Sequence, residues 1–138
     1  MSNEKRVRLK TGAGFSLLEL LVVIVVLGVV LYFAFPNIVR MRRDSEDNLA
    51  RARAEMLNLA VAAYFQSVGD RPTAISNWFN KGSDAARYTD FLKQYIAFPS
   101  ATLSGFMPST NYTITFDATN PLVNKATLRG PDRVDIAY

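Results

Sequence analysis

Glu19 is the side chain whose chemistry stands out, because it directly precedes twenty residues without a charge, positions 20–39. Twenty helical residues rise roughly 30 Å, which matches the hydrocarbon core of a bilayer. A carboxylate inside such a helix costs about 2.5–3.5 kcal/mol on insertion scales. Glu19 is therefore a candidate functional residue, although the alternative that it only reaches toward the membrane surface stays open.

The residues before Glu19 suggest processing. A basic cluster ends at Lys10 and is followed by Thr11-Gly-Ala-Gly, which is small and flexible, as a processing site must be. A secretory signal would have an apolar core of about 7–15 residues and a small-x-small cleavage site. The apolar stretch is too long, and its end at residues 32–36 offers no such site. An uncleaved signal anchor fits the length but explains neither Glu19 nor the small residues.

Several kinds of chemistry are excluded by composition, since the chain has neither cysteine nor histidine. Disulfides, Cys/His zinc sites and Ser-His-Asp or Cys-His catalysis all need residues that are missing. No glycine-rich phosphate loop is present. Asp117, Asn120, Asp132 and Asp135 could supply oxygen ligands to Ca²⁺, but solvated loop residues are the preferred interpretation. We therefore expect no enzyme activity, no cofactor and no metal site.

The net charge of +4 comes mostly from the first fourteen residues, which hold four of the sixteen bases and only one of the twelve acids. The rest of the chain carries twelve bases and eleven acids, so it is nearly neutral. Nucleic acid binding depends on clustered positive charge that neutralises phosphates. We therefore expect no nucleic acid partner.

The segment Gly14-Phe-Ser-Leu-Leu-Glu-Leu20 resembles the class III signal and N-terminal methylation motif of type IV pilins and type II secretion pseudopilins. The resemblance implies that a prepilin peptidase cuts between Gly14 and Phe15, and that the new N-terminal Phe15 is then methylated. Glu19 becomes the fifth mature residue, where this family places its glutamate. Gly28 and Pro36 fall where the family often has a glycine and a helix-bending proline.

The resemblance also implies a function and partners. The chain would be a structural subunit that polymerises into a type II secretion pseudopilus or a type IV pilus-like filament. Its partners would be other copies and other pilin-like subunits, the prepilin peptidase and N-methyltransferase, and an inner-membrane assembly platform with a cytoplasmic ATPase. It would cross the bacterial inner membrane once, with its C-terminal head in the periplasm.

Several alternatives stay open at this point. A secretion pseudopilin is favoured over a pilus subunit, because the head is small and the chain lacks cysteine. A DNA-uptake filament, the major or minor status of the subunit and its cargo are undecided. A different class of function, a signal-anchored periplasmic binding module, is the second hypothesis.

Electrostatics predicts a role for Glu19 in a filament, independently of the family resemblance. Cleavage frees an α-amine, whose pKa in an unperturbed chain is about 7.7–8.0. If the apolar helices pack in a central bundle, each Glu19 carboxylate is buried and needs a partner of opposite charge. The Phe15 amine of a neighbouring subunit is a suitable cation. Such a pair specifies register more than it adds stability.

The elements that position these residues are predicted from periodicity. One helix over 15–68 should contain the apolar stretch, bend near Gly28 and Pro36, and end at Gly69. Arginine and acidic residues at four-residue spacing over 40–55 predict a mainly solvated helical face, with charge complementarity between subunits of a filament as the alternative. An apolar stripe is expected to face the head. Its members are Leu49, Ala52, Met56, Leu59 and Ala63, with Leu57, Val61, Tyr64, Phe65 and Val68 beside them.

A small α+β head should follow, so the predicted fold is pilin-like, with the long helix packed on a small antiparallel sheet. Strands are predicted at 112–116, 122–128 and 133–138, with a turn at 129–132. Ser83 should cap a helix that runs to about Phe98, and Trp78 and Phe79 should fill the head core. The predicted divisions are a leader at 1–14, a membrane and filament-core helix at 15–39, and the helix continuation with the head at 40–138.

Overall fold

Residues 14–138 are described by a computed structural model, and the rest of the predicted leader, 1–13, lies outside the described residues. The chain divides into two compact units, Met1–Arg40 and Met41–Tyr138, and each is described by itself. The elements are α1 (Leu17–Ser67), α2 (Arg71–Asn80), α3 (Asp84–Arg87), a π-helical turn η1 (Tyr88–Leu92), a 3₁₀ turn η2 (Lys93–Tyr95), α4 (Leu103–Phe106), and strands β1 (Thr113–Thr115), β2 (Thr127–Arg129) and β3 (Asp135–Ile136).

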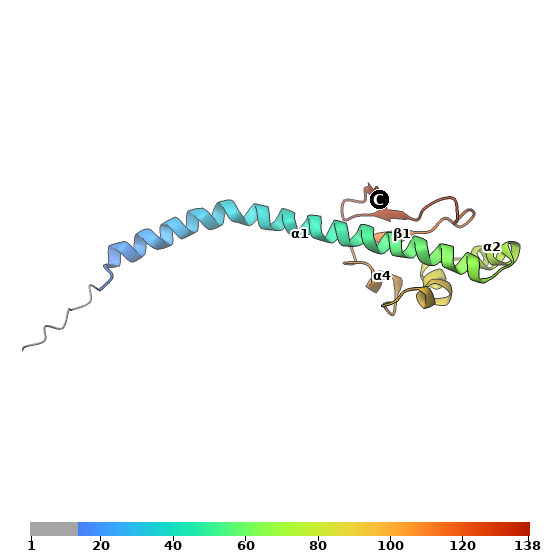
Figure 1. The fold of residues 1–138 in the computed structure, drawn as a ribbon. Coiled ribbons are helices and arrows are strands. Elements are labelled where there is room, and N and C mark those ends of the chain that lie inside the picture. The colour runs from blue at the N-terminus through green and yellow to red at the C-terminus, as the bar shows by residue number, and fades with distance from the viewer. Residues whose placement is uncertain (1–13) are drawn as a thin grey trace, which may run out of the picture. The chain divides into compact units, whose positions relative to one another are not determined.

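Helix α1 is the long helix that the sequence predicts, and its 51 residues begin and end within two residues of the expected limits (Figure 1). It stops at Gly69, whose φ of 69° lies in the left-handed region that glycine adopts without a steric cost. The helix assignment continues through Pro36.

The short helices differ from the prediction. Ser83 does cap α3, since its hydroxyl accepts the Ala86 N–H at 3.3 Å. The helical run then changes to η1 and η2 and ends at Tyr95 rather than Phe98. The sequence prediction missed α2 and α4. Helix α2 begins only two residues after Gly69, with Pro72 in its first turn, where a proline loses no hydrogen bond.

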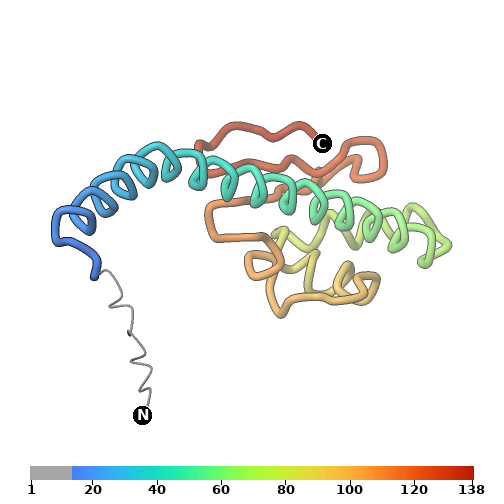
Figure 2. Tube along the Cα trace, turned by 60° about the vertical axis from the view of Figure 1, so that its left-hand side comes forward, coloured from blue at the N-terminus to red at the C-terminus, as the bar shows by residue number. Residues whose placement is uncertain are grey.

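The sheet has three antiparallel strands in the order β1-β2-β3, as the α+β prediction requires. Leu128 in the central strand pairs with Ile114 on one side and Ile136 on the other. The strands are shorter than predicted, and residues 122–124 form a turn in which the Val123 N–H donates to Asn120 O. Figure 2 shows the two C-terminal strands running beside the head portion of α1.

One face of α1 closes the head core, and it includes four members of the predicted stripe, Leu57, Val61, Tyr64 and Phe65. The buried positions of the helix are Ala50, Ala54, Leu57, Ala60, Val61, Tyr64 and Phe65. The prediction was wrong for Leu49, Ala52, Met56 and Leu59, which are exposed. Trp78 is fully buried, as predicted, and stacks near Phe91, whereas Phe79 is 59% exposed and lies outside the core.

The charged part of α1 is tied to the C-terminal half of the head, which the prediction of a solvated face did not foresee. Arg43 pairs with Asp132, Glu55 pairs with Lys125 at 3.1 Å, and Asp47 accepts the Tyr112 hydroxyl at 2.5 Å. Of the predicted pairs within the helix, Arg42–Glu46 forms at 3.1 Å. These long-range contacts fix where the strands lie along the helix.

Candidate functional site

The start of α1 is a capped helix terminus. The Ser16 hydroxyl accepts the Glu19 N–H at 3.1 Å, and the Ser16 carbonyl accepts the Leu20 N–H at 3.2 Å. Ser16 is therefore the N-cap, and Glu19 lies in the first turn, where a carboxylate is stabilised by the helix macrodipole. Ser16 was not among the predicted site residues, although its spacing to Glu19 is that of a capping box.

Gly14 and Phe15 lie before this cap, outside the helix, and both are exposed. Proteolytic cleavage concentrates in exposed segments with few backbone hydrogen bonds. The bond between Gly14 and Phe15 has that property, while the Ser16 cap protects the chain that follows. The structure thus places the two predicted cleavage residues and Glu19 within one short segment.

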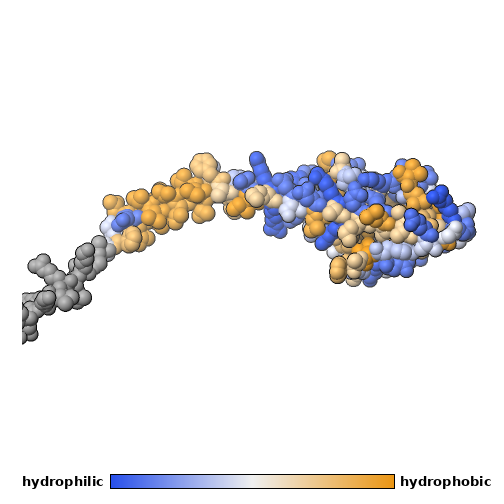
Figure 3. All heavy atoms as spheres, in the orientation of Figure 1, coloured by the Kyte–Doolittle hydropathy of each residue, from blue (hydrophilic) through white to orange (hydrophobic). Residues whose placement is uncertain are grey.

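The apolar N-terminal part of α1 is a candidate membrane-spanning segment. Within the described residues, α1 is the one helix long and apolar enough to cross a bilayer, by length and composition, and its most apolar window has a mean hydropathy of 2.9. No residue in that window is buried against the rest of the chain. Hydrophobic side chains cover the visible face of this segment in Figure 3.

Gly28 and Pro36 both lie inside the apolar part of α1. A Cβ added at Gly28 would meet nothing within 4 Å, so no contact in the single chain requires a glycine there. Pro36 removes one backbone donor from the helix and weakens it locally. Their role as a bend in an assembled filament therefore stays a prediction.

The acidic residues considered as calcium ligands are engaged in other contacts. One Asp117 carboxylate oxygen accepts the backbone N–H groups of Thr119 and Asn120, both at 2.7 Å, and the other accepts the Asn124 amide. These bonds favour the charged form and hold the pKa of Asp117 well below its usual range. Asp135 pairs with Arg129 at 3.0 Å. Among residues 14–138, no group of three or more acidic side chains could hold a metal ion.

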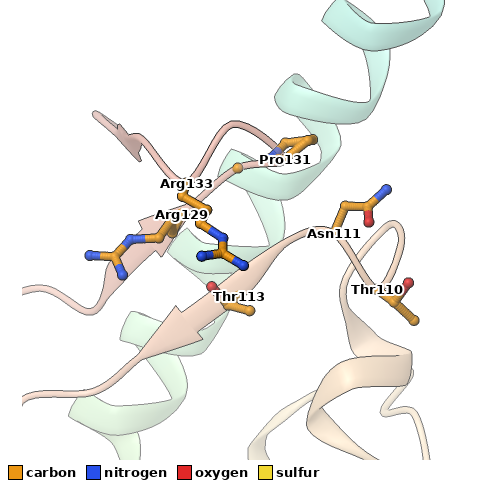
Figure 4. Close-up of a pocket in the computed structure, with 7 residues that line it drawn as sticks. Thr110, Asn111, Thr113, Arg129, Pro131 and Arg133 are labelled. Atoms are coloured by element: carbon orange, nitrogen blue, oxygen red, sulfur yellow. The ribbon is translucent and has the colours of Figure 1, made fainter.

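A polar cleft of about 500 Å³ lies between the chain entering β1 and the β2–β3 hairpin (Figure 4). Its lining includes Thr113, Arg129 and Arg133 but no carboxylate, so a side-chain general base is missing from the lining. Arg133 has a φ of 58°, which is rare for a residue with a side chain. The hairpin turn therefore holds this arginine in a strained conformation.

Comparison with known proteins supports the N-terminal site. Residues 9–34 match the family model described as the prokaryotic N-terminal methylation motif. No significant match was found among curated proteins or among solved structures. The matched motif indicates a structural subunit rather than an enzyme, and it implies processing by prepilin peptidase. The chain carries the class III signal of type IV pilins and pseudopilins, on a pilin-like α+β fold.

Proposed function

We propose that this chain is a pseudopilin-like subunit of a type II secretion pseudopilus or a related type IV pilus-like filament. Residues 1–14 are removed, Phe15 is N-methylated, and the mature chain polymerises. The observation that carries the proposal is the exposed Gly14–Phe15 bond directly before the Ser16 cap, with Glu19 in the first turn of a membrane-length apolar helix.

The chemistry of the new N-terminus gives Glu19 a role in the filament. The freed amine of Phe15 is a cation near the positive end of α1, where the helix macrodipole disfavours it. A carboxylate from the first turn of a neighbouring subunit offsets this, and Glu19 lies in that turn. Once buried, the pair is costly to break, about 3–5 kcal/mol, because one charge is left uncompensated. The pair therefore sets the axial stagger between neighbours.

The same proposal assigns the remaining parts of the chain. Residues 15–39 anchor the precursor in the inner membrane and later form the filament core, while 40–138 form the periplasmic head. Gly28 and Pro36 let the helix adjust when it leaves the bilayer. The platform and its cytoplasmic ATPase supply the work of extraction, since the chain itself has no nucleotide-binding loop.

Processing is tested by the intact mass of the protein purified from its host. The expected mass lacks residues 1–14 and carries one added methyl group on Phe15. Gly14→Val should block cleavage, because the branched side chain replaces the small residue at the cut, whereas the matched variant Gly12→Val should be cleaved normally. A wild-type protein that keeps its leader would exclude this proposal and favour a signal-anchored binding module.

The register role of Glu19 is tested by Glu19→Gln, which keeps the size of the side chain and removes its charge. Membrane insertion should persist, while the yield of sheared filaments should fall strongly. Ser16→Ala is the control, because it removes the cap bond to the same residue and leaves the carboxylate in place. Equal losses in the two variants would show that Glu19 acts only in starting the helix.

A further inference from the structure

The polar cleft beside β1 contains an arginine whose charge has no counterpart in the head. Within the described part of the chain, the exposed Arg133 side chain makes no hydrogen bond and no ion pair. The two carboxylates of the β2–β3 hairpin are used by other arginines. Asp132 pairs with Arg43, and Asp135 accepts the Arg129 Nε–H at 3.0 Å. One positive charge, that of Arg133, is therefore left over at the cleft.

The turn that carries Arg133 is fixed by its backbone and by packing. The Arg133 N–H donates to Gly130 O at 3.0 Å, and the Gly130 N–H donates to Val134 O at 3.1 Å. A Cβ on Gly130 would lie 3.0 Å from the Ile136 side chain, so the chain passes close to β3 at this point. Figure 4 shows the Arg133 guanidinium turned toward Thr113 of β1. The turn thus presents this arginine to the cleft.

The rest of the lining supplies neutral hydrogen-bonding groups. Thr110, Asn111 and Thr113 contribute two hydroxyls and an amide, and all three residues are exposed. Thr113 is the register partner of Arg129, so these two side chains stand next to each other on the exposed face of the sheet. The Nε–H of Arg129 is one of its five N–H donors, and the other four lie at the end of the side chain. The cleft therefore combines hydrogen-bond donors with one uncompensated positive charge.

A carboxylate matches this lining better than a more highly charged anion does. The planar fork of a guanidinium binds a carboxylate through two parallel N–H···O bonds. Hydroxyl and amide donors beside the fork can satisfy the remaining lone pairs of the carboxylate. A phosphate group carries about −1.5 to −2 charges near neutral pH and needs more positive charge than Arg133 alone provides, since Asp135 compensates Arg129. The lining contains no carboxylate that would repel the ligand.

We propose that the cleft between β1 and the β2–β3 hairpin binds a carboxylate group, held by Arg133 together with the hydroxyl and amide groups of residues 110–113. The carboxylate belongs either to an acidic side chain of a partner protein or to a small organic acid, and both offer the same chemistry. The φ of 58° at Arg133 agrees with this assignment, because strained residues with a side chain cluster at ligand sites. The proposal goes beyond the proposed function, since it requires neither cleavage nor polymerisation.

An NMR titration of the full-length, ¹⁵N-labelled protein in uncharged detergent tests the site. The probe is a capped Gly-Ser-Asp-Ser-Gly peptide at low salt and about pH 6, where its aspartate stays charged. It should shift the Arg133 Nε–H and Thr113 amide signals to saturation, whereas the same peptide with asparagine in place of aspartate should not shift them. Acetate distinguishes the source of the carboxylate. Tighter binding of the acidic peptide than of acetate assigns the site to a protein side chain, and equal affinity assigns it to a small acid.

Substitutions of Arg133 test its part in binding. Arg133→Ala should weaken binding of the acidic peptide about tenfold or more, because charge-assisted hydrogen bonds are lost. Arg133→Lys should recover only part of the affinity, since an ammonium lacks the planar fork. Arg133→Gly should lose as much affinity as the alanine variant while relieving the strained backbone, so a poorly folded alanine variant would not prevent the test. The matched control is Arg71→Ala, which removes an exposed arginine of α2 outside the lining and should leave the affinity unchanged.

Three results would overturn the proposal. Unchanged affinity in Arg133→Ala and Arg133→Gly would remove Arg133 from the site, and equal binding of the acidic and neutral peptides would exclude recognition of the carboxylate. Tighter binding of inorganic phosphate than of the acidic peptide and acetate would overturn the choice of a carboxylate. A leader that stays uncleaved would contradict the proposed function alone, because none of these titrations depends on processing.

Discussion

The turn between β2 and β3 offers a quantitative test of backbone strain at Arg133. The Arg133 N–H donates to Gly130 O at 3.0 Å, and the Gly130 N–H donates to Val134 O at 3.1 Å. This is the geometry of a tight hairpin loop whose last residue is left-handed, a position that glycine normally fills. Arg133 takes it with a φ of 58°. We predict that Arg133→Gly stabilises the head.

The magnitude follows from two opposing contributions. The left-handed conformation costs a residue with a Cβ about 1–2 kcal/mol. Glycine removes that strain but loses about 0.5–1 kcal/mol of extra chain entropy on folding. Both main-chain bonds of the turn persist in the variant, and within residues 14–138 the Arg133 side chain makes no hydrogen bond or ion pair that would be lost. The net gain in free energy of unfolding is about 0.5–1 kcal/mol, or about 2–8 °C in Tm for a head of this size.

Fluorescence of Trp78 is the natural readout, because it is the single tryptophan of the chain and is fully buried in the head. Thermal and urea unfolding of the full-length protein in detergent should both shift upward for Arg133→Gly. Arg133→Ala removes the same side chain but keeps the strained Cβ, so its midpoint should match the wild type. An equal gain in both variants, or no gain with glycine, would refute the argument from strain.

Three further predictions concern the head. Leu57→Ala should lower the free energy of unfolding by about 2–5 kcal/mol because Leu57 is fully buried, whereas Leu59→Ala should change it by less than about 0.5 kcal/mol; denaturant titration compares them. Arg87→Ala should lower the free energy of unfolding by about 2–4 kcal/mol in the same titration, because the buried guanidinium donates to Trp78 O at 3.1 Å and to Asp84 at 2.8 Å. Arg87→Lys should recover only part of this free energy. Asp117 has a lowered folded pKa, so its contribution is fully present above the unfolded pKa and is lost as pH falls through the folded value. The stability difference between wild type and Asp117→Ala should therefore stay constant from neutral pH to about pH 5 and shrink only in stronger acid.

The sequence predicts α1 well because its signals are local. A long apolar run, the following amphipathic repeat and Gly69 specify one helix and its end without reference to the rest of the chain. Ser83 is also local, since its hydroxyl caps the helix that starts at the next residue. The N-terminal motif belongs to the same class, because its residues are consecutive and the family model matches them.

What the sequence missed depends on long-range packing. Both stripes of α1 have helical spacing, and only the position of the head decides that Leu57 is buried while Leu59 is exposed. The predicted Arg42–Glu46 pair forms, but the predicted partner of Arg43 was wrong for the same reason, since Arg43 pairs with Asp132, eighty-nine residues away, instead of with an acid on its own helix. Residues 122–124 read as a strand by composition, but the Asp117 turn and its hydrogen bond to Asn124 hold them in a loop.

The two stripes also divide α1 into a side that the head core uses and a side that it does not use. Leu57 and Leu59 are two residues apart and therefore point to nearly opposite sides of α1, about 200° apart. The core side is closed by contacts with Trp78, Tyr88 and the sheet, so the head has no need of the outer side for its stability. An apolar surface that folding does not use remains exposed only at a cost in solubility, which a permanent partner removes. Substitutions that unfold the head should therefore map to the buried face of α1, whereas substitutions at the exposed positions Leu49, Met56 and Leu59 should leave the folded head intact.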